Sequence, residues 1–409
     1  MKIAFFSDCY LDLTGGIVSA INAQREALIG LGHEVYIFTT AYPKTKSELK
    51  RLAKSHIFVV PSCKYCFRGL TPVSRRPKII EKWLLNNFPE LRSFDVFYSH
   101  YESGCSIAGL RLGKSLHIPT IQVMHGREDI GESNIIPYGF RTITALLLNW
   151  FHSWYIPHPI KIPRDNYLAT TIARSKMWEL MVCHANFADL VLTPSEHFRK
   201  KLLHYHVTKE IKVLPNSFAD DKFPEVKDPK VLNEDEELKI VWHSRVTPEK
   251  RIVPFLEALT MVTGKYRLDV YGEGVDLARA KKYAKDHHIN AIFHGTVPFD
   301  KFTKALADSH LDVLVSYDCD TFGMTLIEAE AYGTPVLFCD PDMKEIVPNG
   351  GYVLTNTPDP SDMASAINDL IKHPAKIQQM SEVMLSHRNE VSASNRIKKL
   401  LEICATITS

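Results

Sequence analysis

The 409-residue sequence has no apolar run of the ~18–20 residues that a membrane-spanning helix requires. The nearest candidate, residues 143–156, is interrupted by Asn149, His152 and Ser153. The apolar start of the chain, residues 2–8, is too short for the apolar region of a secretory signal peptide and fits a first buried strand. These absences favour a cytoplasmic protein whose contact with a membrane, if any, is peripheral.

The sequence also lacks paired cysteines, short repeats, low-complexity tracts and coiled-coil heptads. Of its 8 cysteines, only Cys63 and Cys66 are closely spaced, and no second pair completes a zinc site. We therefore expect reduced thiols and no structural metal. A composition of 45% hydrophobic and 23% charged residues is typical of a globular protein, and the length predicts two or three domains.

The net charge of +2 conceals an uneven distribution. Residues 44–92 contain 12 Lys or Arg and 3 Glu, so this segment carries +9 and the remainder about −7. A basic face of this kind is either simply solvated or contacts anionic lipid or nucleic acid.

Short β-rich runs alternate with helical periods, as in a chain of βαβ units. The predicted strands of the first half are residues 2–7, 34–39, 56–60, 95–100, 120–124, 190–193 and 211–214, with a helix over 17–31. The predicted strands of the second half are residues 239–242, 267–271, 291–293, 311–315, 335–338 and 352–354.

The pattern is interrupted once, by the polar and Pro-containing residues 217–237. It predicts an α/β protein of two Rossmann-like, doubly wound domains facing a cleft, where ligands commonly bind. We expect domains at 1–216 and 238–385, a linker at 217–237, and a C-terminal helix at 386–409 that packs back towards the first domain.

Two cations follow the first strand of the second half. Arg245 ends the run Val241 to Arg245, and Lys250 opens the next helix. A guanidinium and an ammonium at such a turn can neutralise a diphosphate, although two cations in a loop are more often solvated surface.

A second charged turn follows the apolar strand 311–315. It contains Asp318, Cys319 and Asp320, then Phe322 and Gly323, before a helix predicted at 324–332. Glycine permits a tight turn, and the free N–H groups of the helix start, at Met324 and Thr325, suit an anion.

Two carboxylates of this segment have different places. Asp320 precedes the predicted helix, whereas Glu328 lies a full turn inside it, so the two would contact different parts of an extended ligand. Glu330 is expected to be an ordinary exposed helix residue, which is also the simplest interpretation of Glu328 by itself.

In combination these residues resemble the signature of retaining GT-B glycosyltransferases of the family 4 type. Asp320 and Glu328 are followed by Ala329-x-Ala331-x-Gly333-Thr334-Pro335-Val336, and Arg245 with Pro248-Glu249-Lys250 lies upstream. Further matches run along the chain at Gly15-Gly16, Leu31-Gly32-His33-Glu34-Val35, His125-Gly126, Pro194-Ser195-Glu196, Leu214-Pro215-Asn216, Tyr271 to Gly274 and Phe293-x-Gly295.

The resemblance implies a role for each matching residue. Arg245 and Lys250 would hold the donor diphosphate, Asp320 would contact the donor sugar, and Glu328 would bind the nucleotide ribose. His125 would lie near the donor sugar, although a lone histidine is more often a core residue. The implied donor site also includes Gly15, Gly16, Gly272, Phe322, Gly323, Met324 and Thr325.

The implied reaction moves a hexose from a UDP- or GDP-sugar to an acceptor hydroxyl with retained configuration. Side-chain cations would stabilise the leaving diphosphate, so no metal or cofactor is expected. No side chain is nominated as a nucleophile, because a front-face route lets the leaving phosphate accept the acceptor's proton. No nucleic-acid partner is expected.

The chain departs from the family pattern at Asp320, where the family usually has Glu. Asp318-Cys319-Asp320 also matches the Asp-x-Asp metal motif of GT-A glycosyltransferases. A Rossmann oxidoreductase is disfavoured, because the segment 272–274 lacks a third glycine and Gly15-Gly16 lacks the spacing. A GT-B epimerase and an inactive nucleotide-binding subunit remain alternatives.

The acceptor side is less defined. Lys64, Arg68, Arg75, Arg76, Lys78 and Lys82 are interleaved with Tyr65, Phe67, Trp83 and Leu84. Together with the aromatic run 150–155, they suit an anionic membrane surface, unless that run is simply a buried helix. The segment 125–129 is also similar to bacterial diacylglycerol glucosyltransferases, except that Gly126 and Arg127 replace their usual Thr and Tyr. The acceptor is therefore a hydroxyl of a membrane lipid, of a polysaccharide intermediate or of a glycoprotein.

Overall fold

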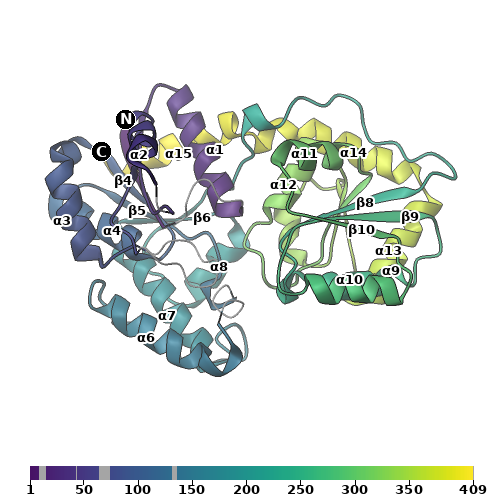
Figure 1. The fold of residues 1–409 in the computed structure, drawn as a ribbon, viewed down its shortest axis with the longest axis horizontal. Coiled ribbons are helices and arrows are strands. Elements are labelled where there is room, and N and C mark those ends of the chain that lie inside the picture. Colours follow the sequence, from purple (N-terminus) through teal and green to yellow (C-terminus); the bar gives the residue numbers. More distant parts are fainter. Residues whose placement is uncertain (9–14, 43, 64–73, 131–135, 409) are drawn as a thin grey trace. The chain divides into compact units, whose positions relative to one another are not determined.

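The computed structural model describes residues 1–8, 15–42, 44–63, 74–130 and 136–408. The chain forms two compact units (Figure 1). The first contains residues Met1–Pro215 and Arg396–Ser409, and the second contains Asn216–Asn395.

The first unit is built on a parallel sheet of order β3-β2-β1-β4-β5-β6-β7. Its strands are β1 (Lys2–Ser7), β2 (Glu34–Thr39), β3 (Ile57–Val59), β4 (Val96–His100), β5 (Thr120–Val123), β6 (Leu190–Thr193) and β7 (Ile211–Val213). Its helices are α1 (Gly16–Gly30), α2 (Lys46–Lys54), α3 (Pro77–Asn87), α4 (Gly104–Leu116), α6 (Arg141–Ser153), α7 (Ile172–Phe187), α8 (Glu196–His204) and most of α15 (Ala393–Thr408). Buried Val, Ile and Phe side chains of β1, β4 and β5 fill both faces of the sheet, as is usual for parallel strands.

The second unit repeats this architecture with a parallel sheet of order β10-β9-β8-β11-β12-β13. Its strands are β8 (Leu238–His243), β9 (Tyr266–Tyr271), β10 (Ala291–Gly295), β11 (Leu311–Leu314), β12 (Val336–Phe338) and β13 (Tyr352–Leu354). Its helices are α9 (Ile252–Leu259), α10 (Leu277–Asp286), α11 (Phe299–Ala307), α12 (Met324–Ala331), α13 (Pro360–Lys372) and α14 (Ala375–His387). In Figure 1, α9, α10 and α13 cover one face of this sheet and α11, α12 and α14 the other.

All thirteen strands predicted from the sequence occur among the described residues, and the predicted fold class is confirmed. In each sheet the strand order reverses beside the first strand, between β1 and β4 and between β8 and β11. The carboxyl ends of strands at such a reversal form the usual ligand site of a doubly wound sheet.

The unit boundaries differ from the expected domains at two places. The segment 217–237 belongs to the second unit rather than to a separate linker, because Phe218, Phe223 and Leu232 are buried in its core. The C-terminal helix begins at Ala393 rather than 386, and its residues Ile397, Leu400 and Cys404 pack into the core of the first unit. No helix within the described ranges has both the length and the apolar content needed to cross a bilayer.

Candidate active site

The cations and acids singled out in the second half of the sequence lie at one edge of the second sheet. Strands β8 and β11 are parallel neighbours, paired at Ile240 and Leu311. Arg245 and Lys250 follow the carboxyl end of β8, and Asp320 follows that of β11. The topology therefore places both turns at the strand-order reversal of this sheet.

Lys250 and Asp320 form a direct ion pair. Lys250 Nζ lies 2.5 Å from Asp320 Oδ1, and Ser316 Oγ donates a further hydrogen bond to this carboxylate. Burial opposes the charged forms, but the pair outweighs it: Asp320 raises the pKa of Lys250 above its ordinary value, and Lys250 holds the pKa of Asp320 below its own. Both groups are therefore charged at neutral pH.

Arg245 is the more accessible cation of this site. Its side chain is 64% exposed, and its Nη2 lies 3.5 Å from Glu249 Oε1. Because the guanidinium is exposed to solvent and the separation is long, this pair contributes little to stability. The guanidinium fork is therefore available for bidentate contact with an anion.

Gly323 gives the second turn its shape. Its φ is +71°, in the left-handed region, and it caps the N-terminus of α12. A Cβ at this position would lie 2.9 Å from Leu314 Cδ2 and 3.2 Å from Leu326 Cδ1. The neighbouring Phe322 is buried and anchors the turn. Met324 and Thr325 are the first residues of α12, so their N–H groups have no hydrogen-bond partner within the helix.

Gly272 supports the turn that carries Arg245. Its φ is +136°, and a Cβ would lie 2.1 Å from the carbonyl oxygen of Ser244. Only glycine permits this close approach of the end of β9 to the turn after β8. Its packing role is thus evident, and its predicted contact with a donor stays a prediction.

Glu328 contacts a residue that the sequence analysis did not single out. His243, the last residue of β8, lies with Nδ1 3.4 Å from Glu328 Oε2 and Nε2 3.1 Å from Asp312 Oδ2. Glu330, expected to be exposed, is instead buried against the body of the second unit.

The predicted residues of the first unit lie at the strand ends of its own sheet. Gly15 and Gly16 begin α1 after β1, and His125 lies two residues beyond β5. His125 Nε2 is 2.8 Å from Nδ1 of His100, the last residue of β4. Burial lowers the pKa of His125 to about 4, so its imidazole is neutral at physiological pH and can donate from one nitrogen and accept at the other.

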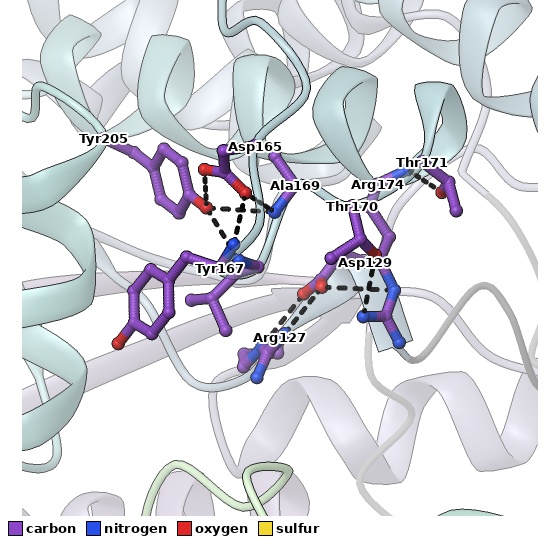
Figure 2. A network of polar contacts seen from close by, with 10 residues as sticks. Arg127, Asp129, Asp165, Tyr167, Ala169, Thr170, Thr171, Arg174 and Tyr205 are labelled. Carbon is purple, nitrogen blue, oxygen red and sulfur yellow. Dashed lines mark hydrogen bonds and ion pairs between the residues drawn. The ribbon is translucent and has the colours of Figure 1, made fainter.

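The segment after His125 is held by a buried ion pair (Figure 2). Arg127 Nη2 lies 2.8 Å and Nε 3.1 Å from the two carboxylate oxygens of Asp129, whose side chain is fully buried. Arg174, in the first turn of α7, approaches the same carboxylate with Nε at 4.0 Å. Arg127, which departs from the lipid glucosyltransferase pattern, thus holds Asp129, and Asp129 links this segment to α7.

The loop before α7 is fixed by Asp165 and Tyr205. The Tyr205 hydroxyl donates to Asp165 Oδ2 at 2.6 Å and accepts from the backbone N–H groups of Leu168 and Ala169 (Figure 2). Tyr205 comes from the end of α8, so α8, the loop and α7 form one polar network around Asp129 and Asp165.

The aromatic run 150–155 is exposed on one side and buried on the other. Helix α6 directs Ala145, Asn149 and His152 inward, and Trp150 is 57% exposed. The other exposed apolar residues of this region are Tyr138, Phe140, Ile143, Leu146, Leu147 and Trp154. The simple alternative of a buried helix is therefore wrong for Trp150, Ser153 and Trp154, whereas His152 and Tyr155 are buried and Phe151 is half-buried against the core.

Some predicted residues of the basic face are close to this helix. Arg76, Lys78 and Ile79 of the α3 region line a surface hollow of about 490 Å³ with Trp154 and Tyr155. Lys64, Tyr65, Phe67 and Arg68 lie outside the described residues.

The two doubly wound units form the GT-B fold, with a cationic turn at the strand-order reversal of the second, and this architecture does not fit the GT-A alternative. The family model Glycosyltransferase Family 4 matches residues 14–222, and Glycosyl transferases group 1 matches residues 224–384. The chain belongs to glycosyltransferase family 4. It is a hexosyltransferase.

Two characterised relatives are similar over most of the chain. The alpha-monoglucosyldiacylglycerol synthase of Streptococcus pneumoniae is 26% identical over 360 residues, covering 82% of this chain and 70% of the relative. The protein of the same name from Acholeplasma laidlawii is 24% identical and covers 100% of this chain and 96% of the relative.

Solved structures share the fold. Anabaena HepE in complex with UDP has a TM-score of 0.69 at 14% identity, covering 99% of this chain and 100% of HepE. Sucrose-phosphate synthase of Thermosynechococcus elongatus has a TM-score of 0.70 at 14% identity, with coverage of 99% and 100%. TarM has a TM-score of 0.70 at 15% identity, with 99% of each chain covered.

Proposed function

We propose that this enzyme transfers glucose from UDP-glucose to the hydroxyl of a diacylglycerol-type membrane lipid, with retention of configuration. The observation that carries the donor half of the proposal is the Lys250–Asp320 pair with the exposed Arg245 at the strand-order reversal of the second sheet. The names of the two characterised relatives support the sugar and the acceptor. The UDP complex of HepE supports the choice of base.

In this mechanism the bond between the anomeric carbon and the β-phosphate oxygen breaks on the face where the acceptor oxygen bonds. The acceptor's hydroxyl proton passes to the departing diphosphate. Negative charge develops on that diphosphate, and Lys250, Arg245 and the N–H groups at the start of α12 stabilise it more in the transition state than in the ground state. Side-chain charge provides this stabilisation, so the proposal includes no metal and no cofactor.

The remaining predicted roles follow from the same arrangement. Asp320 accepts from a sugar hydroxyl while Lys250 turns to the diphosphate, and Glu328 accepts from the ribose hydroxyls. For the first unit we propose that neutral His125 contacts the donor sugar and that the backbone of Gly15 and Gly16 approaches the donor phosphates.

The donor is tested by thermal unfolding with UDP-glucose, UDP-galactose, UDP-N-acetylglucosamine and GDP-mannose. A ligand at about 100 times its Kd stabilises the folded state by about 2.7 kcal/mol. We expect UDP-glucose to raise Tm the most. Stabilisation by the GDP-sugar alone would overturn the donor, and stabilisation by none would indicate an inactive subunit.

The acceptor is tested by mass spectrometry after incubation with UDP-glucose and diacylglycerol in mixed micelles. The expected product is diacylglycerol heavier by one hexose, with the α-anomer identified by NMR. Conversion of the sugar nucleotide in the absence of any acceptor would favour an epimerase instead.

For the location of the enzyme we propose peripheral binding at the cytoplasmic face of an anionic membrane through α6 and α3. The outward residues Ile143, Leu147 and Trp150 suit insertion among lipid headgroups, and Arg76 and Lys78 beside Trp154 suit anionic lipid. Interfacial aromatics and adjacent cations on one face are the usual pattern for such binding.

Replacing Leu147 and Trp150 together by serine is expected to weaken liposome binding by about tenfold or more, because two apolar side chains no longer enter the interface. Flotation with vesicles of phosphatidylcholine, with and without phosphatidylglycerol, measures this binding. Wild-type binding should require the anionic lipid and weaken with added salt.

The matched control replaces two exposed apolar residues of the second unit, Val231 and Val275, by serine. This variant should float like wild type. Unchanged flotation of the Leu147→Ser, Trp150→Ser variant would contradict the assignment of α6.

A further inference from the structure

We propose that His243 is a positioning residue that orients Glu328 for the donor ribose by bridging it to the buried Asp312. The inference rests on the proposed ribose contact of Glu328 and adds a residue to which neither the sequence pattern nor the relatives assign a role. It concerns how the carboxylate is held, not which group it binds.

Three elements meet at His243. The histidine is the last residue of β8, Asp312 lies on the neighbouring strand β11, and Glu328 lies on α12, which follows β11 in the chain. Nε2 of the imidazole is 3.1 Å from Asp312 Oδ2, and Nδ1 is 3.4 Å from Glu328 Oε2. His243 in the sheet thus connects the buried carboxylate of Asp312 to α12, the helix that carries Glu328.

The charge state of the bridge follows from its two partners. Carboxylates only accept hydrogen bonds, so an imidazole that faces one carboxylate from each nitrogen satisfies both only as an imidazolium. Burial opposes this charge, but Asp312 and Glu328 outweigh it and raise the pKa of His243 to about 10. His243 is therefore a cation at neutral pH.

Asp312 contributes a buried carboxylate that contacts His243. Its side chain is fully buried, and its second oxygen, Oδ1, has no hydrogen-bond partner among the described residues. A buried carboxylate is unfavourable unless it is paired, so Asp312 secures the imidazolium and the imidazolium secures Asp312.

The imidazole itself is held in place from the side. Its ring lies 4.7 Å from that of Phe302 on α11, at an interplanar angle of 35°. Glu328 is bound through Oε2 by a ring that cannot turn freely, and its side chain keeps 14% exposure. A glutamate oriented in advance loses less conformational entropy when a ribose binds, in the way that outer partners orient metal ligands.

The test compares two probes, UDP and 2′,3′-dideoxy-UDP, by isothermal titration calorimetry with wild type, Glu328→Gln and His243→Gln. Wild type should bind UDP at least tenfold more tightly than the dideoxy analogue. His243→Gln should weaken UDP binding by about tenfold, by analogy with the loss of outer partners at ligand sites, and change dideoxy-UDP binding by less than about twofold. The double variant should bind UDP no more weakly than Glu328→Gln does.

The outcomes separate the two ideas. Equal binding of both probes by wild type overturns the ribose role of Glu328, and the inference with it. Discrimination by wild type that persists in His243→Gln overturns the positioning role alone, as does an equal loss for both probes, which would indicate a merely structural histidine. Should His243→Gln fail to fold, Asp312→Asn replaces it, because it removes the charge that secures the imidazolium while keeping the side-chain shape, and the same selective loss for UDP is expected.

Discussion

Lys250→Met is expected to lower kcat by about 10²–10³-fold, the usual cost of removing one group that stabilises developing negative charge. The departing diphosphate carries more charge in the transition state than in the ground state, so the loss falls on kcat rather than on donor binding alone. Steady-state kinetics with UDP-glucose measure both parameters. Methionine keeps most of the side-chain volume and removes only the ammonium.

This substitution also leaves Asp320 without its cation. An unpaired, largely buried carboxylate destabilises a fold by itself, so the double variant Lys250→Met, Asp320→Asn is needed. It should regain stability in urea denaturation while remaining inactive. Lys285→Met, which removes an exposed lysine of the same unit, is the control for net charge and should be unaffected. Turnover near the wild-type value in Lys250→Met would contradict the proposed site.

Glu328→Gln is expected to raise the KM for UDP-glucose by about 10- to 100-fold, in line with the ~1.5–3 kcal/mol of a hydrogen bond to a charged group. The ribose is remote from the bond that breaks, so kcat should fall less than KM rises. Initial rates over a range of donor concentrations separate the two.

The matched control is Glu257→Gln, the same change at an exposed position of α9 in the same unit. It should behave as wild type. A fall in kcat without a change in KM would place Glu328 at the reacting centre and contradict a ribose contact.

The architecture follows from local patterns. Most strands of the two sheets are short runs rich in apolar or β-branched residues, which distinguishes them from the polar loops between them. Residues 217–237 were predicted to be a linker because the segment is polar overall. Its composition does not reveal that a few residues, such as Phe218 and Phe223, are buried in the core of the second unit.

The site could be predicted as a set of residues but not as a set of contacts. Arg245 and Lys250 look equivalent in the sequence, yet Lys250 pairs with Asp320 and Arg245 with Glu249. Side-chain partners 70 residues apart depend on the strand order, which the local pattern does not encode.

His243 was missed because a single histidine at the end of an apolar strand is usually a core residue. The signal that could have found it is Asp312, a charged residue within the buried strand Leu311 to Leu314, because an acid in that place needs a nearby cation. Glu330 was expected to be exposed but is buried, because the inward face of a helix as short as α12 cannot be identified from its sequence.

The contact between Lys250 and Asp320 bears on how product leaves the enzyme. The ammonium is already paired with a carboxylate, so the proposed donor binding would exchange one anion for another and gain less Coulomb energy than capture by a bare lysine would. In the proposed reaction, the same carboxylate would compete with UDP for Lys250 after transfer. An internal competitor of this kind favours rapid dissociation of the nucleotide, which would otherwise inhibit each following turnover.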